Sequence, residues 1–152
     1  VLPDDLVQAW LGRGIPVCNV YGSTETGPFS LALGPEHALS HIGSCGWPAL
    51  GVQAKLTQMG SDGVGQVSLR GPAIVQNYWP QLPALDEQGW FHTGDLARID
   101  TDQSWRIVGR SKDMIISGGE NIYPAEVEQV LQRLHFPGKR GFTCLRTDQA
   151  RG

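Results

Sequence analysis

The sequence has few cysteines, no long apolar run and no surplus of basic residues, and each shortage excludes a class of protein. Its 152 residues include three cysteines, whose number and spacing fit neither a disulfide framework nor a zinc site. No stretch approaches the ~20 apolar residues of a membrane-spanning helix. Twelve Lys and Arg against fifteen Asp and Glu give a net charge of −3 without a basic stripe, so nucleic acid is not an expected partner. We expect reduced thiols and a cytoplasmic protein.

The composition that remains is that of a folded chain with many turns. Forty per cent of the residues are hydrophobic, 18% are charged and the mean hydropathy is −0.21, which excludes a disordered tail. Twenty glycines and ten prolines predict many tight turns. The chain begins at Val1 without a secretory signal, and we expect it to be a piece of a longer protein.

The first forty residues have the order helix, strand, polar loop. Apolar residues at i, i+3 and i+4 predict a short helix around 6–10, capped by Asp4 or Asp5. A strand is predicted over 15–21, and it ends at the turn-rich run 22–28. This order is typical of α/β proteins, whose ligands bind beyond the carboxyl ends of strands.

The middle of the chain has the alternating pattern of a small antiparallel sheet. Strands are predicted over 52–57, 66–70, 96–100 and 105–108, with a hairpin loop over 100–104. The pattern therefore predicts a change from α/β to β structure at about residue 43.

The end of the chain is predicted to hold one strand and one amphipathic helix. The strand covers 114–117, a Gly118-Gly119 turn follows, and the helix begins at Pro124. The helix has apolar residues at i, i+3, i+4 and i+7, namely Val127, Val130, Leu131 and Leu134. The chain offers this face and the first helix little to pack on, so we expect exposed apolar surface and self-association.

The loop after the first predicted strand carries the groups of a nucleotide site. In Tyr21-Gly22-Ser23-Thr24-Glu25-Thr26-Gly27, an aromatic ring can flank a base, a hydroxyl and backbone N–H groups can hold phosphate, and the carboxylate can hold a divalent cation. An ordinary polar turn explains the same residues.

Two further motifs carry charged groups next to glycines. In Trp90-Phe91-His92-Thr93-Gly94-Asp95-Leu96, the carboxylate of Asp95 matches the two hydroxyls of a ribose, although a turn aspartate is the simpler interpretation. Arg110 can contact phosphate and ribose oxygens, and the pair Gly118-Gly119 can let a ligand approach the backbone. A surface ion pair and a hairpin turn explain the same residues. The four histidines show no ligand spacing.

In their order, these motifs resemble the adenylate-forming superfamily, which includes AMP-forming acyl-CoA synthetases, luciferases and peptide-synthetase adenylation domains. The resemblance covers about residues 14–134 and is strongest to fatty-acid and medium-chain acyl-CoA ligases. It implies an α/β fold with a β-rich subdomain, in which the end of a large domain precedes the start of a small mobile α+β domain. The implied division is 1–42 for the end of the nucleotide-binding subdomain, 43–110 for a β-barrel-like subdomain and 111–152 for the hinge and the small domain.

The resemblance also implies roles for single residues around ATP. Tyr21 and Gly22 would flank the adenine, and Ser23 and Thr26 would complete the nucleotide contacts. Thr24 would contact phosphate and Glu25 would hold Mg²⁺, and these two are the implied catalytic residues.

Further roles follow for the ribose, the hinge and the acceptor. Asp95 would take the ribose hydroxyls with Arg110 beside it, and Lys112 would be the hinge. Gly118, Gly119 and Glu120 would lie where the pantetheine of CoA passes.

The implied reaction joins a carboxylic acid to AMP with release of pyrophosphate, after which CoA displaces AMP to give a thioester. Two alternatives remain: a non-catalytic nucleotide-binding or interaction module, and an adenylation domain that loads a carrier protein. The sequence lacks the family's phosphate loop and its C-terminal lysine, so we expect the chain alone to be inactive. Gln66 replaces a usual Glu, and Gln103-Ser104-Trp105 replaces a usual glycine turn, which predicts a distorted hairpin.

Overall fold

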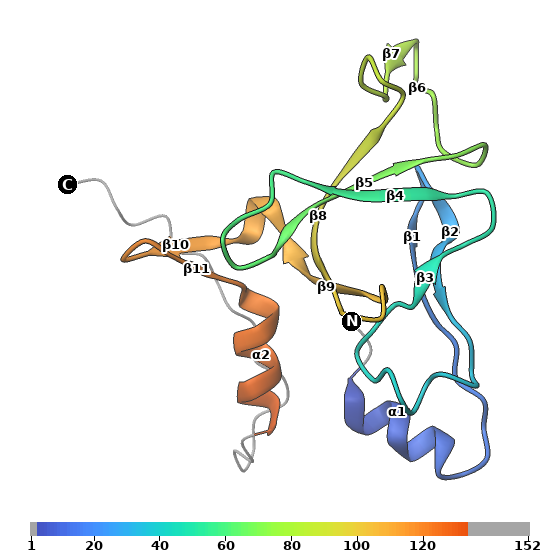
Figure 1. Cartoon of the computed structure of the whole chain (residues 1–152), viewed down its shortest axis with the longest axis vertical. Helices are drawn as coiled ribbons and strands as arrows, with labels where there is room; N and C mark the ends of the chain where they lie inside the picture. Colours follow the sequence, from blue (N-terminus) through green and yellow to red (C-terminus); the bar gives the residue numbers. More distant parts are fainter. Residues whose placement is uncertain (1–2, 134–152) are drawn as a thin grey trace.

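The computed structural model describes residues 3–133, which form a mainly antiparallel β structure with a helix near each end (Figure 1). In chain order the elements are α1 (Asp4–Leu11), β1 (Asn19–Ser23), β2 (Gly27–Leu33), β3 (Trp47–Pro48), β4 (Gln53–Thr57), β5 (Gly65–Arg70), β6 (Asn77–Tyr78), β7 (Leu82–Pro83), β8 (Phe91–Ile99), β9 (Trp105–Arg110), η1 (Ser111–Asp113), β10 (Ile115–Ser117), β11 (Glu120–Ile122) and α2 (Pro124–Arg133).

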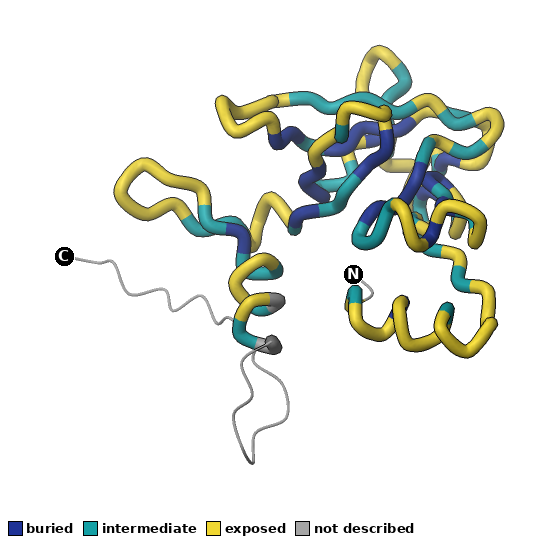
Figure 2. The backbone as a smooth tube through the Cα atoms, turned by 60° about the horizontal axis from the view of Figure 1, so that its bottom comes forward, coloured by how far each residue is buried: buried dark blue, intermediate teal, exposed yellow. Residues whose placement is uncertain are grey.

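Two sheets form the body of the molecule. The larger has the strand order β4-β5-β8-β9 and the smaller has the order β1-β2-β3. Leu31 of β2 packs in one buried cluster with Val67 and Leu69 of β5, Ala97 of β8 and Trp105 of β9. Figure 2 shows this buried interior between the two sheets, while α1 and the β10–β11 hairpin are largely exposed. The core therefore joins the sheets into one body.

The first helix is confirmed, but its predicted cap is wrong. Pro3 occupies the N-cap position and no side chain caps the helix, whereas the predicted caps, Asp4 and Asp5, lie in its first turn. Leu6 and Trp10 are each 41% exposed, in agreement with the predicted lack of packing partners.

The region after α1 differs most from the prediction. The strand predicted over 15–21 is β1, which begins at Asn19 and continues to Ser23. Within the run 22–28, which was predicted as a polar loop, only residues 24–26 form a turn, because β1 continues to Ser23 and β2 begins at Gly27 and pairs antiparallel with β1. Gly27 has a φ of +75°, which glycine adopts without strain and which lets the chain reverse there. All strand pairs in the described part of the chain are antiparallel, so the parallel pairing of an α/β unit is not found there.

The predicted strands of the central sheet are confirmed as β4, β5, β8 and β9, of which β9 is two residues longer than predicted and ends at Arg110. The strand β8 begins at Phe91, five residues before the predicted start at Leu96. The predicted distortion at Gln103 takes a simple form, since this residue adopts a φ of +67° in place of a glycine. Ile99 and Trp105, which flank this turn, pair in regular register. The irregularity of the hairpin lies in β8, between Leu96 and Ala97.

The C-terminal arm, defined as residues 115–133, contains β10, β11 and α2. The predicted strand, glycine turn and helix start at Pro124 are all confirmed, with φ values of +62° at Gly118 and +87° at Gly119. Val127 and Val130 on α2 are exposed, as predicted, while Leu134 lies outside the described residues. The arm leaves the larger sheet through η1 (Figure 1).

Residues 3–133 contain neither a membrane-spanning helix nor a disulfide bond. None of the helices in this range is long and apolar enough to cross a membrane. Cys18 and Cys45 are free thiols, as expected.

Candidate functional site

Three strands bring Tyr21, Asp95 and Arg110 together, and these are the residues that the resemblance assigns to adenine and ribose. The phenol O–H of Tyr21, on β1, donates a hydrogen bond to Oδ2 of Asp95 at 2.6 Å. Arg110, at the end of β9, donates from Nε to Oδ1 of the same carboxylate at 2.7 Å. Asp95 and Arg110 are also direct partners in the β8–β9 register. The two sheets therefore build this cluster together, and its hydrogen-bonded pair Tyr21 and Asp95 is 74 positions apart in the sequence.

Asp95 lies inside β8 and not at its edge or in a turn, contrary to the simpler interpretation of its motif. Gly94 before it has a φ of +75°, and the register of β8 shifts just after Leu96. Thr93 holds this irregular stretch, because its Oγ1 donates to the carbonyl of Val67 and accepts the backbone N–H of Asp95, both at 3.0 Å. Sequence analysis missed Thr93, although a threonine two residues before an aspartate is a known signal for this local bond.

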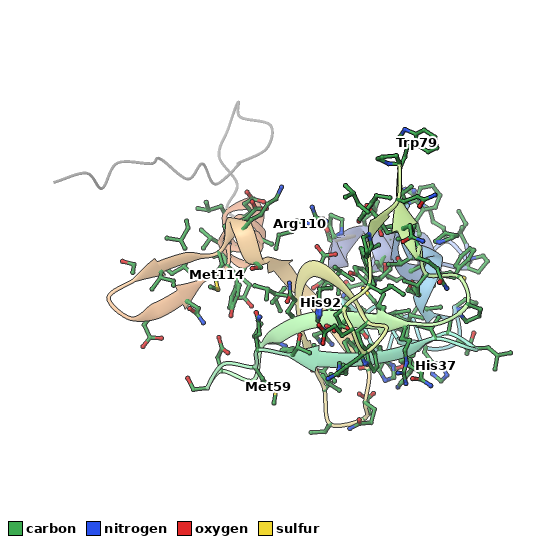
Figure 3. All side chains as sticks on the ribbon, turned by 90° about the horizontal axis from the view of Figure 1, so that it is seen from above. His37, Met59, Trp79, His92, Arg110 and Met114 are labelled. Atoms are coloured by element: carbon green, nitrogen blue, oxygen red, sulfur yellow. The ribbon has the colours of Figure 1, made fainter. Side chains whose placement is uncertain are left out.

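The carboxylate of Asp95 is shielded from water on most sides. Its side chain is 13% exposed, while that of Arg110 is 50% exposed. Burial raises the pKa of Tyr21 well above its ordinary value, and the hydrogen bond to Asp95 raises it further. Tyr21 is therefore a neutral donor at physiological pH, and Asp95 is a paired acceptor whose outer neighbour, Arg110, faces solvent (Figure 3).

The turn between β1 and β2 holds the second part of the predicted site. Ser23 Oγ donates to Oε2 of Glu25 at 2.8 Å, and this bond lowers the pKa of Glu25 below its ordinary value. The nearby charge of Arg110 lowers it further. Thr26 is only 2% exposed, and its Oγ1 accepts the backbone N–H of Ser23 at 2.9 Å. Thr26 thus closes the turn from inside, and Glu25 remains ionised on its surface.

Gly22 and Thr24 differ in what they offer to a ligand. A Cβ at Gly22 would collide with the backbone of Gly27 and Pro28, so the hairpin leaves room there only for glycine. Thr24 is exposed at the top of the turn. The structure therefore gives Gly22 a packing role and leaves the Thr24 hydroxyl on the surface.

The residue predicted for the hinge lies next to this cluster, and those predicted for CoA lie apart from it. Lys112 lies in η1, two residues after Arg110, where the chain leaves the sheet. Gly118, Gly119 and Glu120 lie at the exposed turn of β10 and β11, at the tip of the C-terminal arm (Figure 1). A Cβ at either glycine would meet nothing within 4 Å, so the backbone of this turn is open to approach.

The fold and the sequence define the class to which this chain belongs. The family described as "AMP-binding enzyme" matches residues 1–79, more than half of the chain, and the chain belongs to this family. Its relatives are CoA ligases. It is 41% identical over 145 residues to a feruloyl-CoA synthase of Amycolatopsis, which covers 90% of this chain and 29% of that protein. It is 38% identical over 136 residues to a 2-succinylbenzoate–CoA ligase of Geobacillus kaustophilus, with 85% and 28% covered. The chain spans less than a third of the length of these relatives.

Solved structures of this family show the same fold. The o-succinylbenzoate CoA synthetase of Bacillus subtilis, in complex with its acyl-adenylate intermediate, aligns with a TM-score of 0.83 at 32% identity over 97% of this chain and 32% of that one. The same enzyme in complex with ATP and a magnesium ion aligns with a TM-score of 0.78 at 35% identity over 86% and 29%.

Proposed function

We propose that this chain is part of an ATP-dependent, AMP-forming acyl-CoA synthetase and that it supplies the adenosine side of the nucleotide site. The observation that carries the proposal is the cluster of Tyr21, Asp95 and Arg110, in which a half-buried ring, a shielded carboxylate and a solvent-facing guanidinium meet. A flat ring, an acceptor pair and a cation suit a base, a ribose diol and a phosphate in that order.

The hydrogen bonds already present leave room for a ribose. A carboxylate has about four acceptor positions, and Tyr21 and Arg110 use one on each oxygen of Asp95. Two positions therefore remain for the two hydroxyls of the sugar. The bond from Tyr21 fixes the carboxylate in place, so little reorganisation is needed when the ribose arrives.

Glu25 fits the role of a magnesium ligand that is shared with phosphate. Its carboxylate is ionised, and Ser23 bonds only one of its oxygens. Mg²⁺ is commonly held by one or two carboxylates together with the phosphates of a substrate, and a single carboxylate at this turn fits that arrangement. Thr24, exposed beside Glu25, would contact phosphate, and Ser23 and Thr26 would hold the turn in shape.

The reaction would proceed in two steps. A carboxylate oxygen attacks the α-phosphorus of ATP, the bond to pyrophosphate breaks, and an acyl-adenylate forms. The thiolate of CoA then attacks the acyl carbon, AMP leaves, and a thioester remains. The residues of this chain would bind and orient the adenosine part, while Gly118, Gly119 and Glu120 would let the pantetheine pass. Lys112 would be the hinge between the domains, and the domain boundaries would lie at 42/43 and 110/111.

The protein would act in the cytoplasm, with which its free thiols agree. Because the chain spans 29% of the feruloyl-CoA synthase, we expect residues outside it to complete the site and expect no ligation by the chain alone.

The test is a titration of the chain with AMP and with 2′,3′-dideoxy-AMP, followed by NMR. We expect AMP to bind with a Kd on the order of millimolar and to shift resonances around Tyr21 and Asp95. The dideoxy analogue should bind much more weakly, because two charge-assisted hydrogen bonds of ~1.5 kcal/mol each are lost. The Asp95→Asn variant should lose this preference, whereas Glu87→Gln, which alters an exposed carboxylate elsewhere, should keep it.

Equal binding of the two nucleotides by the unmodified chain would contradict the ribose assignment. A micromolar Kd for AMP would instead favour the alternative of a self-sufficient nucleotide-binding module. Transfer of the acyl group to a carrier protein is distinguished in the longer enzyme, since thioester formation would then proceed without CoA.

A further inference from the structure

A hydrogen-bonded contact joins the β4–β5 loop to the C-terminal arm, and Asp62 is its centre. The two oxygens of this carboxylate have different partners. Oδ1 accepts the backbone N–H of Val64 at 3.1 Å, which holds Asp62 in its own loop. Oδ2 accepts the phenol O–H of Tyr123 at 2.8 Å and Nδ2 of Asn121 at 3.3 Å, both from the arm. One side chain thus bridges segments 61 residues apart.

The ring of Tyr123 is buried against the strands that carry the proposed ribose site. Tyr123 is 7% exposed and packs with Val64, Leu96 and Val108. Leu96 follows Asp95 directly in β8, and the pair Leu96 and Gly109 is next in register to the pair Asp95 and Arg110. Tyr123 therefore connects the arm to the same two strands that hold the nucleotide cluster.

Much of the arm's apolar surface faces solvent and not the body. Ile116 of β10 is 68% exposed, and Val127 and Val130 of α2 are 37% and 59% exposed. Met114, where the arm begins, packs beside the Tyr123 cluster, and Figure 3 shows it across from Met59 of the β4–β5 loop. The contact around Tyr123 is thus the main hydrophobic anchor of the arm in the described residues.

We propose that Asp62 and Tyr123 form a latch that holds the C-terminal arm against the larger sheet and that must open before the arm can turn about Lys112. This inference rests on the proposed function, in which Lys112 is a hinge. Asp62 precedes the hinge and Tyr123 follows it, so any large rotation there separates the two side chains. Both are positioning residues, because they set the placement of the turn at Gly118, Gly119 and Glu120 relative to the nucleotide cluster.

The chemistry of the contact suits a latch that opens and closes. Asp62 is exposed, so water can replace its hydrogen-bond partners when the contact opens. The hydrogen bond from Tyr123 lowers the pKa of Asp62 below its ordinary value. Burial, reinforced by Asp62, raises the pKa of Tyr123 to about 12, so Tyr123 remains a donor at physiological pH. The other charged group that acts on Tyr123 is Glu126 of α2.

Hydrogen–deuterium exchange of the 152-residue chain tests the latch directly. Tyr123→Phe removes the hydroxyl and leaves both the ring and the loop bond from Val64 to Asp62. We expect amides of residues 115–131 to exchange about fivefold faster at neutral pH, the effect of losing one hydrogen bond, while residues 91–110 keep their protection. Tyr78→Phe, which alters an exposed tyrosine, is the matched control and should change neither segment.

The pH dependence separates a latch from simple packing. Since the pKa of Asp62 is lowered on folding, its contribution is present above the ordinary pKa and is lost as the pH falls through the lowered value. The protection of the amides of residues 115–131, corrected for intrinsic exchange rates, should fall in the unmodified chain as the pH drops from the ordinary to the lowered pKa of Asp62. Tyr123→Phe should show no such pH-dependent step. Asp62→Asn keeps an acceptor, so it should retain much of the protection at neutral pH but lose the step.

Two results would overturn the latch: unchanged exchange of 115–131 in Tyr123→Phe, or a pH step that survives in Asp62→Asn. Neither measurement involves a nucleotide, so a failed latch and a failed nucleotide site are distinguished by separate experiments.

Discussion

The hydrogen bond between Tyr21 and Asp95 allows a quantitative test of the site in the chain itself. Tyr21→Phe removes only the donor, and Asp95→Ala removes the acceptor. A hydrogen bond to a charged group contributes about 1.5–3 kcal/mol to the free energy of unfolding. We expect Tyr21→Phe to lower this free energy by an amount in the lower half of that range, because Arg110 keeps the carboxylate of Asp95 paired. Asp95→Ala should cost about 2–3 kcal/mol, since it also leaves a half-buried phenol without its acceptor. The double variant should recover about 1.5 kcal/mol relative to the sum of the two.

The same pair predicts a dependence on alkaline pH. Folding raises the pKa of Tyr21, so the folded state holds the phenol proton more tightly than the unfolded chain does. The stabilisation is fully present below the unfolded pKa of about 10 and is lost as the pH rises toward the folded value. The difference in unfolding free energy between the unmodified chain and Tyr21→Phe should therefore shrink above pH 10.

Urea denaturation followed by tryptophan fluorescence gives both quantities, because the chain contains five tryptophans. The unmodified chain, the two single variants and the double variant form a double-mutant cycle and are compared at pH 7. The unmodified chain and Tyr21→Phe are compared again between pH 9 and 11. A coupling energy below about 0.5 kcal/mol, the usual error of additivity, would refute the shielded hydrogen bond. A difference that does not change with pH would refute the raised pKa.

Three further predictions concern stability and association. Gln103→Gly should stabilise the chain by about 0.5–1 kcal/mol, because a left-handed residue costs ~1–2 kcal/mol and glycine returns part of this as chain entropy; an unchanged melting temperature would contradict it. Gly46→Ala should lower the free energy of unfolding by more than about 3 kcal/mol, since the φ of Gly46 is +76° and the new Cβ would meet the backbone of β2. Gly118→Ala, with open space around it, should lower it by about 1–2 kcal/mol. Equal losses in urea denaturation would be inconsistent with these contacts. Sedimentation of the chain should show concentration-dependent association that Val127→Gln with Val130→Gln reduces, and a chain that stays monomeric at high concentration would rule this out.

The elements that sequence patterns predicted well are those with glycine or proline at their ends. The strand β5 alternates polar and apolar residue types between Gly65 and Gly71, and α2 begins at a proline. The strand β2 was missed because Gly27 and Pro28 at its start are turn residues, and because its small residues Ser30 and Ala32 give no strong β signal. Ser30 is nevertheless fully buried, since its hydroxyl donates to the carbonyl of Thr26 at 2.9 Å. Its burial depends on a bond that only the folded hairpin supplies.

The residue types of the site were predictable and their connections were not. Tyr21, Asp95 and Arg110 were identified from motifs that follow one another along the chain. Their hydrogen bonds depend on which strand edges meet, because β1 belongs to the smaller sheet and β8 and β9 to the larger one. The register shift in β8 adds a second uncertainty, since a shift of one residue changes the face on which a side chain lies.

The same register places the proposed nucleotide cluster and the proposed latch next to each other. Asp95 and Leu96 are neighbours in β8, and Leu96 packs on Tyr123. We propose that a ligand bound to Asp95 also restrains the strand on which Tyr123 packs. Because coupling between two sites is reciprocal, closure of the latch must then favour the nucleotide by the same free energy by which the nucleotide favours closure. The placement of Tyr123 on this strand pair is therefore the feature through which occupancy of the ribose site can bias the position of the C-terminal arm.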